Sequence, residues 1–268
     1  MKHLLTIAGS DSSGGAGIQA DLKTFAAHGA YGMSVITAVT AQNTIGVTAV
    51  QDILPDIIAA QIDAVFSDIR VDAVKIGMLS RVETICCVAE RLRYWRPAIV
   101  VLDPVMVSKS GYALLQPDAC QALVRELLPL ATLATPNLPE AETLLQRSIT
   151  DRDAMMQAAH DLLAMGMKAV LLKGGHLSGS ADDFLLTNQE GSWFQGERIA
   201  SSHTHGTGCT LSSALAANLA NGLSMANAVK ESKAYVTEGI RHGLAIGGGC
   251  GPTHHFYGLY KKAGLRYE

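Results

Sequence analysis

Glycine, carboxylate, amide and lysine side chains gather in short clusters that are spread along the whole chain. Two clusters are rich in glycine, at residues 9–17 and 203–210. Others contain single polar side chains, namely Gln42, Asp103, Asn137, Glu140 and Lys173. Glycine loops let backbone N–H groups approach an anion, while carboxylates and lysine suit a divalent cation and a phosphate. These residue types together are typical of phosphoryl transfer.

The second glycine cluster has the sequence His-Thr-His-Gly-Thr-Gly-Cys-Thr and precedes an apolar run at residues 211–220. A Gly-Thr-Gly turn that opens a helix stacks backbone N–H groups at the positive end of the helix dipole. Such a turn is a suitable cradle for the charge on transferred phosphoryl oxygens. The alternative is a plain glycine turn with a small N-cap.

Cys209 follows the second glycine of this turn, where its side chain can meet an attacking hydroxyl group. A helix N-terminus lowers the pKa of a thiol, so we predict a lowered pKa and a role as proton acceptor. None of the five cysteines shows zinc-ligand spacing, and the adjacent Cys86 and Cys87 fit a buried helical stretch. Reduced thiols indicate a cytoplasmic protein.

Phosphoryl transfer also requires charge neutralisation by a cation and a basic group. Asp103 and Glu140 are the best candidates for carboxylates that hold Mg²⁺, through water rather than directly. Asn137 suits a phosphate or a metal-bound water, and Lys173 suits the β- or γ-phosphate. Each residue alone fits a helix cap or a surface position equally well, but their joint placement at strand ends favours the functional interpretation.

Two polar residues suit a small heterocycle. The Gln42 amide offers a donor and an acceptor together to a ring nitrogen and an exocyclic amine, and Asp21 is a second candidate. Met78 and Val105 can supply apolar walls, although Met78 fits a plain core position nearly as well. The adjacent His254 and His255 would point to opposite sides of a strand, which favours a structural role.

Short apolar runs alternate with amphipathic stretches. Strands are predicted at residues 4–8, 34–40, 73–76, 98–102, 130–134 and 169–172. Helices are predicted at residues 18–28, 56–66, 82–93, 117–128, 139–146, 210–220 and 225–238, with a hairpin at 183–186 and 193–195. Strands that lack polar alternation and lie between helices indicate a mainly parallel sheet buried on both faces. No linker, repeat or charge run interrupts the pattern, so we predict one α/β domain over residues 1–268.

Composition excludes several classes of protein. The net charge is −3 with no basic stripe, which argues against a nucleic-acid binder. The sequence has no apolar stretch of about 18 residues and no signal peptide, so we expect no membrane span and a cytoplasmic location. Residues 15–20 match a permissive dinucleotide-binding fingerprint. The glycines lie too far after the first strand, however, and no acidic residue ends the second strand, so the pattern argues against a nicotinamide-binding Rossmann enzyme.

The chain resembles the hydroxymethylpyrimidine/phosphomethylpyrimidine kinases of thiamine biosynthesis, within the ribokinase-like superfamily. Eight ordered segments carry the resemblance, at residues 6–23, 32–44, 75–79, 102–106, 135–142, 173–177, 204–210 and 251–256. The resemblance implies a three-layer α/β/α sandwich with a central, mostly parallel sheet and helices on both faces. It also implies a homodimer, and two successive phosphorylations of a pyrimidine by ATP and Mg²⁺.

Site residues follow from the same resemblance, motif by motif. Gln42 would bind the pyrimidine, with Asp21, Met78 and Val105 nearby. Cys209 would take the place of the catalytic base, and Gly206 and Gly208 would form the anion hole. The metal and nucleotide end would comprise Asp103 and Glu140 for Mg²⁺, and Lys173, Asn137 and Thr207 for ATP.

Three other functions fit parts of the pattern. Pyridoxal or pyridoxine kinases of the same superfamily share the Gly-Thr-Gly-Cys motif and phosphorylate a hydroxymethyl group on another heterocycle. A hydroxyethylthiazole kinase shares the motif, but residues 9–23 fit it less well. A non-catalytic ligand sensor would keep the pocket, yet it would have no need of Asp103, Glu140, Lys173 and Cys209.

Overall fold

One sheet runs through the protein and carries all nine strands of the residues that the structure describes, which are 1–108, 111–116, 118–175 and 181–265 of a computed structural model. Its strand order is β3-β2-β1-β4-β5-β6-β7-β8-β9. The strands are β1 (His3–Asp11), β2 (Tyr31–Gln42), β3 (Val47–Asp52), β4 (Ala73–Ile76), β5 (Val100–Leu102), β6 (Leu133–Ala134), β7 (Ala169–Leu172), β8 (Asp183–Thr187) and β9 (Gly191–Phe194).

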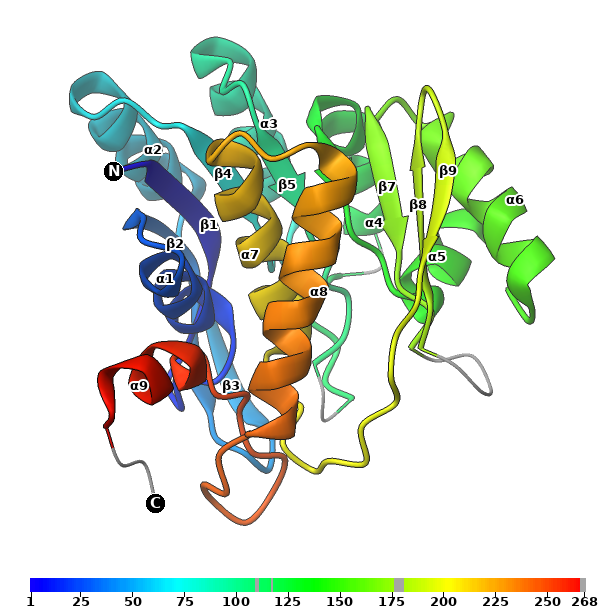
Figure 1. Ribbon diagram of the computed structural model, residues 1–268. Coiled ribbons are helices and arrows are strands. Elements are labelled where there is room, and N and C mark those ends of the chain that lie inside the picture. Colours follow the sequence, from blue (N-terminus) through cyan, green and yellow to red (C-terminus); the bar gives the residue numbers. More distant parts are fainter. Residues whose placement is uncertain (109–110, 117, 176–180, 266–268) are drawn as a thin grey trace.

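Helices connect the strands and cover the sheet on both faces (Figure 1). They are α1 (Gly17–Ala27), α2 (Pro55–Asp68), α3 (Val82–Trp95), α4 (Ala119–Ala122), α5 (Leu138–Leu145), α6 (Arg152–Leu163), α7 (Thr207–Ala220), α8 (Met225–Arg241) and α9 (Tyr257–Ala263). A π-helical turn (Leu123–Leu127) and a 3₁₀ turn (Leu128–Leu130) extend α4.

Six central strands, from β2 to β7 in the sheet order, pair in parallel, and β3, β8 and β9 are antiparallel at the two edges. This arrangement confirms the predicted α/β class, the mainly parallel sheet and the hairpin after it. Because every parallel strand ends at the same edge of the sheet, loops that follow β1, β4, β5, β6 and β7 gather there.

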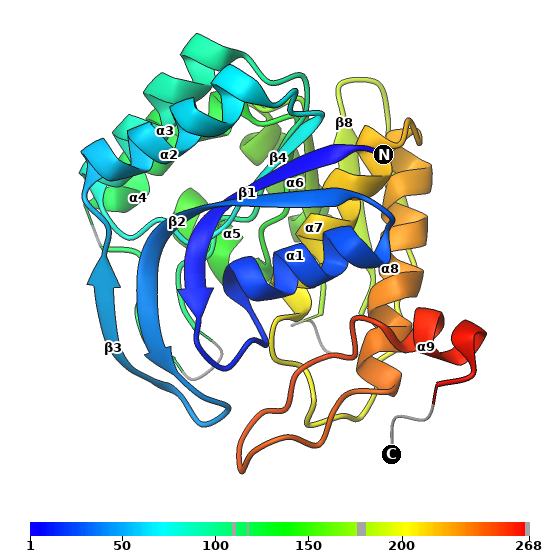
Figure 2. The same ribbon diagram turned by 90° about the vertical axis from the view of Figure 1, so that its left-hand side faces the viewer.

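Two apolar layers hold the sandwich together, one on each face of the sheet. Successive residues of β1 contribute to opposite layers. Leu5 and Ile7 pack with α2, α3 and α6, whereas Leu4 packs with α1, α7 and α8. Figure 2 shows the two helix groups on opposite sides of the sheet. Full burial of an aliphatic side chain contributes about 1.5–3 kcal/mol, so each layer is a large share of the stability.

The sequence prediction omitted three elements. β3 is an edge strand whose residues are mostly half-buried or exposed, so it lacks a clear apolar pattern. α6 carries a helical spacing of buried residues at Met155, Ala158, Ala159 and Leu162, and its N-cap Asp151 accepts a hydrogen bond from the Ala154 amide. That signal was present in the sequence and was missed. The short α9 has no buried residue.

Several boundaries also differ from the prediction, most clearly in two helices. The helix expected at 117–128 is α4 followed by π and 3₁₀ turns, because Pro129 stops a regular helix; Pro117 lies outside the described residues. α7 begins at Thr207, three residues earlier than expected, which places the Gly-Thr-Gly-Cys motif inside its first turn. His254 and His255 precede α9 in a buried turn rather than on a strand.

No helix among the residues described is long and apolar enough to cross a membrane.

Candidate active site

The predicted phosphate and metal residues meet at the carboxyl edge of the sheet. Asp103 directly follows β5, Lys173 directly follows β7, and Lys173 Nζ lies 3.0 Å from Asp103 Oδ1. Asn137 pairs with Lys173 in an isolated bridge, which brings the turn after β6 beside them. A Cβ atom on Gly208 would lie 3.4 Å from Asp103 Oδ2 and 3.7 Å from Lys173 Nζ, so the start of α7 reaches the same place.

The first turn of α7 contains the Gly-Thr-Gly-Cys motif for which the sequence predicted a phosphate cradle. Its N-cap Gly206 has φ +77°, a left-handed conformation, and a Cβ atom there would collide with the Gly15 carbonyl oxygen. First-turn amides, including those of Gly208 and Cys209, have no carbonyl partner one turn earlier. No acidic side chain of α7 itself lies in this turn, so the helix does not neutralise the positive end of its own dipole. Thr207 Oγ1 donates to the Thr204 carbonyl at 2.7 Å and tightens the turn.

Asp103 and Lys173 form a charged pair that lies beside the first turn of α7. Asp103 is 2% exposed, and its Oδ1 also accepts a hydrogen bond from Thr135 Oγ1 at 3.1 Å. Burial would lower the pKa of Lys173, but Asp103 and Glu140 raise it above its ordinary value. Lys173 is therefore a permanent cation beside the amides of α7, suited to a polyphosphate.

Glu140 and Asn137 reciprocally cap the start of α5. Glu140 Oε2 accepts from the Asn137 amide at 2.7 Å, and Asn137 Oδ1 accepts from the Glu140 amide at 2.8 Å. Burial, together with the nearby Asp103 carboxylate, raises the pKa of Glu140 to about 7, while Lys173 opposes the shift. Glu140 can therefore cap α5 and still bind a metal, because its bond to the Asn137 amide leaves the second carboxylate oxygen for another partner.

Cys209 differs from the prediction in its protonation. Burial raises the pKa of its thiol to about 11; Lys75 lowers it, and Asp21 and Asp103 raise it. The predicted lowering is therefore wrong for the free protein, because desolvation at this position outweighs the helix N-terminus. At neutral pH Cys209 is a neutral thiol, and its role as proton acceptor stays a prediction.

Asp21 lies beneath the cradle, paired with a lysine to which the sequence analysis assigned no role. Lys75 Nζ lies 2.8 Å from Asp21 Oδ1, and neither side chain is exposed. Thr6 Oγ1 donates to Asp21 at 2.6 Å and Ser213 Oγ at 2.7 Å. Ser213 lies one helical turn after Cys209 in α7, so its hydrogen bond ties the Lys75–Asp21 pair to the helix that carries the thiol. The structure thus shows Asp21 bound to protein groups, and a contact with the heterocycle stays a prediction.

The predicted heterocycle residues lie at the ends of β2, β4 and β5. Gln42 ends β2 and is half-buried, with Thr40 Oγ1 3.1 Å from its Oε1. Met78 follows β4 and is 9% exposed, with its sulfur against Gly9. Val105 lies two residues after Asp103 and is partly exposed. Met78 therefore lines the loop after β1, which fits both the wall and the core interpretations.

Asp11 and His205 link the two glycine loops, and the sequence analysis gave them no role. His205 Nε2 lies 2.8 Å from Asp11 Oδ2, and both side chains are largely buried. His205 directly precedes Gly206 and also lies 3.4 Å from the Gln42 amide. Its position next to the Gly-Thr-Gly-Cys motif was the one available signal. His176, part of the 173–177 segment, lies outside the described residues.

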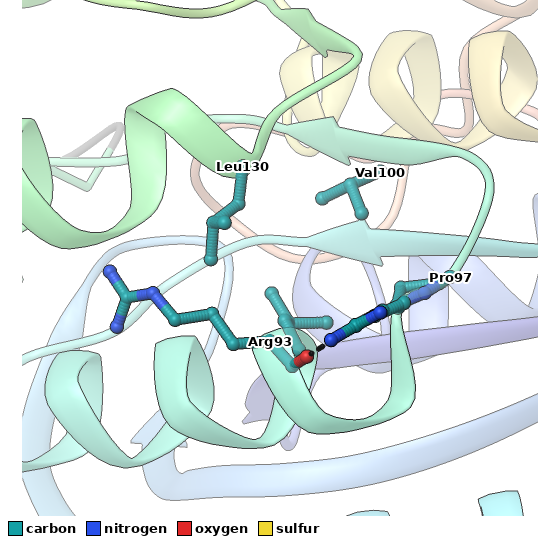
Figure 3. A pocket seen from close by; sticks show the side chains of 6 residues that line it. Arg93, Pro97, Val100 and Leu130 are labelled. Atoms are coloured by element: carbon teal, nitrogen blue, oxygen red, sulfur yellow. Dashed lines mark hydrogen bonds between the residues drawn. The ribbon is translucent and has the colours of Figure 1, made fainter.

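A hollow of about 400 Å³ lies at the start of β5, at the opposite end of this strand from Asp103. Leu92, Arg93, Arg96, Pro97, Val100 and Leu130 line it. Figure 3 shows Arg93 and Pro97 at the end of α3, beside Val100 at the start of β5. The candidate site is at the other end of β5, so this hollow has no part in it. Among the residues described, no group of three or more His, Cys, Asp or Glu side chains is placed to hold a metal by itself.

Comparison with known proteins supports the chemistry of the site. Residues 11–254 match the family model described as phosphomethylpyrimidine kinase. A hydroxymethylpyrimidine/phosphomethylpyrimidine kinase of Rhizobium meliloti is 54% identical over 96% of this chain and 98% of its own length. Its counterpart in Escherichia coli is 51% identical over 95% of this chain and 97% of its own length.

Solved structures resemble the whole fold. A phosphomethylpyrimidine kinase from Clostridium difficile superimposes with a TM-score of 0.81 at 52% identity, and covers 89% of this chain and 99% of its own. An ADP complex of a Bacillus subtilis pyridoxal kinase superimposes with a TM-score of 0.88 at 39% identity, and covers 96% of this chain and 98% of its own. These likenesses confirm the predicted ribokinase-like sandwich.

Proposed function

The chain belongs to the phosphomethylpyrimidine kinase family, and we propose that it uses ATP to phosphorylate 4-amino-5-hydroxymethyl-2-methylpyrimidine twice in thiamine biosynthesis. The first transfer gives the monophosphate and the second gives the diphosphate. Relatives at about 50% identity over nearly the full length carry both activities in their names. The observation that carries the proposal is the first turn of α7, whose amides face the Asp103–Lys173 pair.

The nucleotide end of the site is assigned to the groups around this pair. Lys173 meets the transferred phosphate as a fixed cation, and the Gly208 and Cys209 amides stabilise its oxygens. Asn137 and Thr207 position the nucleotide-binding turns through their bonds to Glu140 and Thr204. The ADP complex of the Bacillus subtilis relative supports nucleotide binding by this fold.

We assign Mg²⁺ to Asp103 and Glu140. The two carboxylates are close enough for Asp103 to raise the pKa of Glu140, so a divalent cation there would relieve their repulsion. Oxygen ligands suit this ion, which usually keeps several waters and binds through one or two carboxylates and the substrate phosphates. When bound, Mg²⁺ supplies charge neutralisation to the phosphate oxygens.

The substrate hydroxyl oxygen attacks the γ-phosphorus, the bond to the ADP oxygen breaks, and the hydroxyl proton must leave. Cys209 is the proposed acceptor of this proton. Because only the thiolate can accept it, the thiol must first release its own proton to solvent. Because the transition state is loose, positioning and charge neutralisation contribute more than the base does. Gln42 holds the ring between walls that include Met78 and Val105.

A second candidate substrate is pyridoxal. The Bacillus subtilis pyridoxal kinase superimposes over 96% of this chain, so the same frame accepts a different hydroxymethyl heterocycle. Its identity of 39% is lower than the 54% of the pyrimidine kinase from Rhizobium meliloti. The pyrimidine is therefore the principal assignment.

Product analysis by mass spectrometry distinguishes the two. The purified protein is incubated with ATP, Mg²⁺ and either the hydroxymethylpyrimidine or pyridoxal, with Lys173→Met as the inactive control. Pyrimidine monophosphate followed by diphosphate is the expected result. Efficient formation of pyridoxal phosphate without pyrimidine diphosphate would contradict the assignment and leave the phosphate chemistry intact.

We also propose that residues 1–268 act as one kinase domain, in a cytoplasmic homodimer that binds neither nucleic acid nor membrane. The single sheet and the five free cysteines support the first two parts. Size-exclusion chromatography with light scattering tests the dimer, and a monomeric mass at micromolar concentration would contradict it.

A further inference from the structure

Asp11 is the most heavily bonded carboxylate of the site. Its Oδ1 accepts from the amide and the hydroxyl of Ser13, at 2.8 and 2.7 Å, and its Oδ2 accepts from the amides of Gly15 and Ala16, at 3.1 and 2.8 Å. Burial would raise the pKa of Asp11, but bonds from His205, Ser13 and Ala16 outweigh it and hold it at about 2. Asp11 is therefore ionised throughout the working range of an enzyme and can only accept hydrogen bonds.

This state decides where His205 carries a hydrogen. Its Nε2 lies 2.8 Å from Asp11 Oδ2, so Nε2 must be the donor of that bond. The ring has little room to move, because a Cβ atom on Gly15 would collide with it. Its backbone is also held, since the His205 amide donates to the Gly251 carbonyl at 3.0 Å. His205 therefore presents a fixed N–H group on its Nε2 side.

The Gln42 amide lies between this N–H group and a hydroxyl. As the structure places the amide, its Nε2 lies 3.4 Å from His205 Nε2 and its Oε1 lies 3.1 Å from Thr40 Oγ1, and exchanging the two atoms keeps both distances. Thr40 Oγ1 has one hydrogen, and the Ser10 carbonyl, 2.9 Å away, can only accept it. Thr40 Oγ1 must then accept a hydrogen from Gln42.

Both neighbours demand the same orientation of the amide. With its nitrogen against His205, two donors would face each other, and Thr40 would have to donate twice from one hydrogen. With its oxygen against His205 and its NH₂ group against Thr40, the Thr40 contact has a donor and an acceptor, and the Gln42 oxygen is a second, longer acceptor for the one hydrogen that His205 Nε2 donates chiefly to Asp11. The oxygen and nitrogen of an amide have nearly the same shape, so the hydrogen-bond network decides between them.

We propose that His205, held by Asp11, is a specificity-determining residue that locks the Gln42 amide in this orientation. The inference rests on the proposed pyrimidine site at Gln42. A locked amide accepts on its His205 side and donates on its Thr40 side, so it selects a ring with an amino group beside an unprotonated ring nitrogen. The amino group then lies toward His205, and the neighbouring hydroxymethyl group lies on the side of Gly206 and the phosphate cradle. His205 acts through Gln42 and is a positioning residue.

The test compares the 4-amino pyrimidine with its 4-oxo counterpart, in which the ring nitrogen donates and the exocyclic oxygen accepts. The ratio of their kcat/KM values is measured for the parent, His205→Ala and His205→Gln. In the parent, the oxo ring pairs with Gln42 only when reversed, with its hydroxymethyl group away from the cradle, so we expect a preference of about 100-fold for the amino ring. In His205→Ala only Thr40 still orients the amide, and we expect the preference to fall to about tenfold.

A side chain that donates from the same place should restore the preference. The Gln amide nitrogen in His205→Gln can donate to both Asp11 and the Gln42 oxygen, so its ratio should be close to that of the parent. Thr40→Val is a near-isosteric second variant that removes the other contact and should lower the ratio by a smaller factor. The KM for ATP and the thermal midpoint are recorded for every variant.

The outcomes separate the inference from the proposed function. Equal loss of activity on both rings in His205→Ala, with an unchanged ratio in Thr40→Val, would show a purely structural role and overturn the inference. The inference is also overturned if His205→Ala fails to fold and Thr40→Val keeps the full preference. No binding of the amino pyrimidine to the parent in calorimetry would overturn the proposed function itself.

Discussion

Two buried lysine–aspartate pairs lie close together in this protein, and they differ in what surrounds them. In the pair of Lys75 and Asp21 neither side chain is exposed, and two hydroxyl groups complete the carboxylate. In the pair of Lys173 and Asp103 the lysine is 15% exposed, and the pair faces the amides of α7. The first pair is completely buried and is called the closed pair below. The second is partly exposed and is called the open pair.

The difference shows how similar chemistry serves two purposes. A closed pair depends on complete hydrogen bonding, because an unpaired buried charge is strongly destabilising. An open pair keeps a cation available for phosphate, at some cost in solvation. Cys209 lies between the two and responds to both, since Lys75 lowers the pKa of its thiol while Asp21 and Asp103 raise it. Each prediction below tests one part of this contrast.

The largest effect is expected for the closed pair. Lys75→Met leaves the Asp21 carboxylate buried without its cation, and we expect a loss of about 3–5 kcal/mol in the free energy of unfolding. Urea unfolding at pH 7 measures it. The double variant Lys75→Met/Asp21→Asn removes both charges and should be more stable than Lys75→Met alone. Equal stabilities of the two variants would contradict a role of the pair in stability.

The open pair should affect catalysis instead. Lys173→Met removes the cation proposed to meet the transferred phosphate, and we expect kcat to fall by about 10²–10³ with the free energy of unfolding within about 1 kcal/mol of the parent. Steady-state kinetics and urea unfolding check the two halves. Lys168→Met, at an exposed position before β7, is the control. A loss of stability as large as that of Lys75→Met would erase the contrast.

Cys209 should show its position between the pairs. Cys209→Ala is expected to lower kcat by about 10², with the dissociation constant of the pyrimidine changed by less than about twofold. Calorimetry and single-turnover kinetics provide the two values. Unchanged turnover would remove Cys209 from the chemistry.

The same thiol gives a pH test in the free protein. With a pKa of about 11 the thiol is protonated below that pH, so alkylation of Cys209 by iodoacetamide should be slow at pH 7 and rise as pH approaches 11. Peptide mass spectrometry locates the label. Half-maximal reactivity near pH 8 would show that the N-terminus of α7 outweighs burial after all.

The smallest effect is expected away from both pairs. Gln42→Ala removes the amide proposed to bind the ring, and we expect pyrimidine affinity to weaken by about tenfold with the KM for ATP unchanged. Calorimetry with the pyrimidine alone measures the first value. An unchanged pyrimidine affinity would refute the assignment of Gln42.

The sequence was sufficient for the parallel part of the fold. β4 and β7 were predicted with the bounds that the structure shows, because their residues are mostly apolar and each strand follows a helical stretch. The edge strand β3 was missed, since it pairs only with β2 and its burial is irregular. Edge position depends on tertiary pairing, which local pattern does not contain.

The candidate site was predicted unevenly for a related reason. Asp103 and Lys173 each follow a buried strand, so their meeting could be expected from the parallel arrangement alone. Lys75 was hidden inside a strand, where a lysine gives no signal of its partner on α1. Asp11 and His205 are 194 positions apart, and only the packing of the two glycine loops brings them together. The thiol pKa depended on burial, which spacing cannot supply.

The strand order has a consequence for synthesis of the chain. From β4 to β9 the chain crosses the sheet in one direction, and α7 then returns to cover β4 and β5. A ribosome adds about 5–20 residues per second, so most of the sheet emerges before this helix does. Until then Val101, Leu133 and Leu171 lack their cover from Leu211 and Leu215. The helix that carries the proposed phosphate cradle is thus also the one that closes the second apolar layer, and a nascent chain gains this turn and its full stability in the same late step.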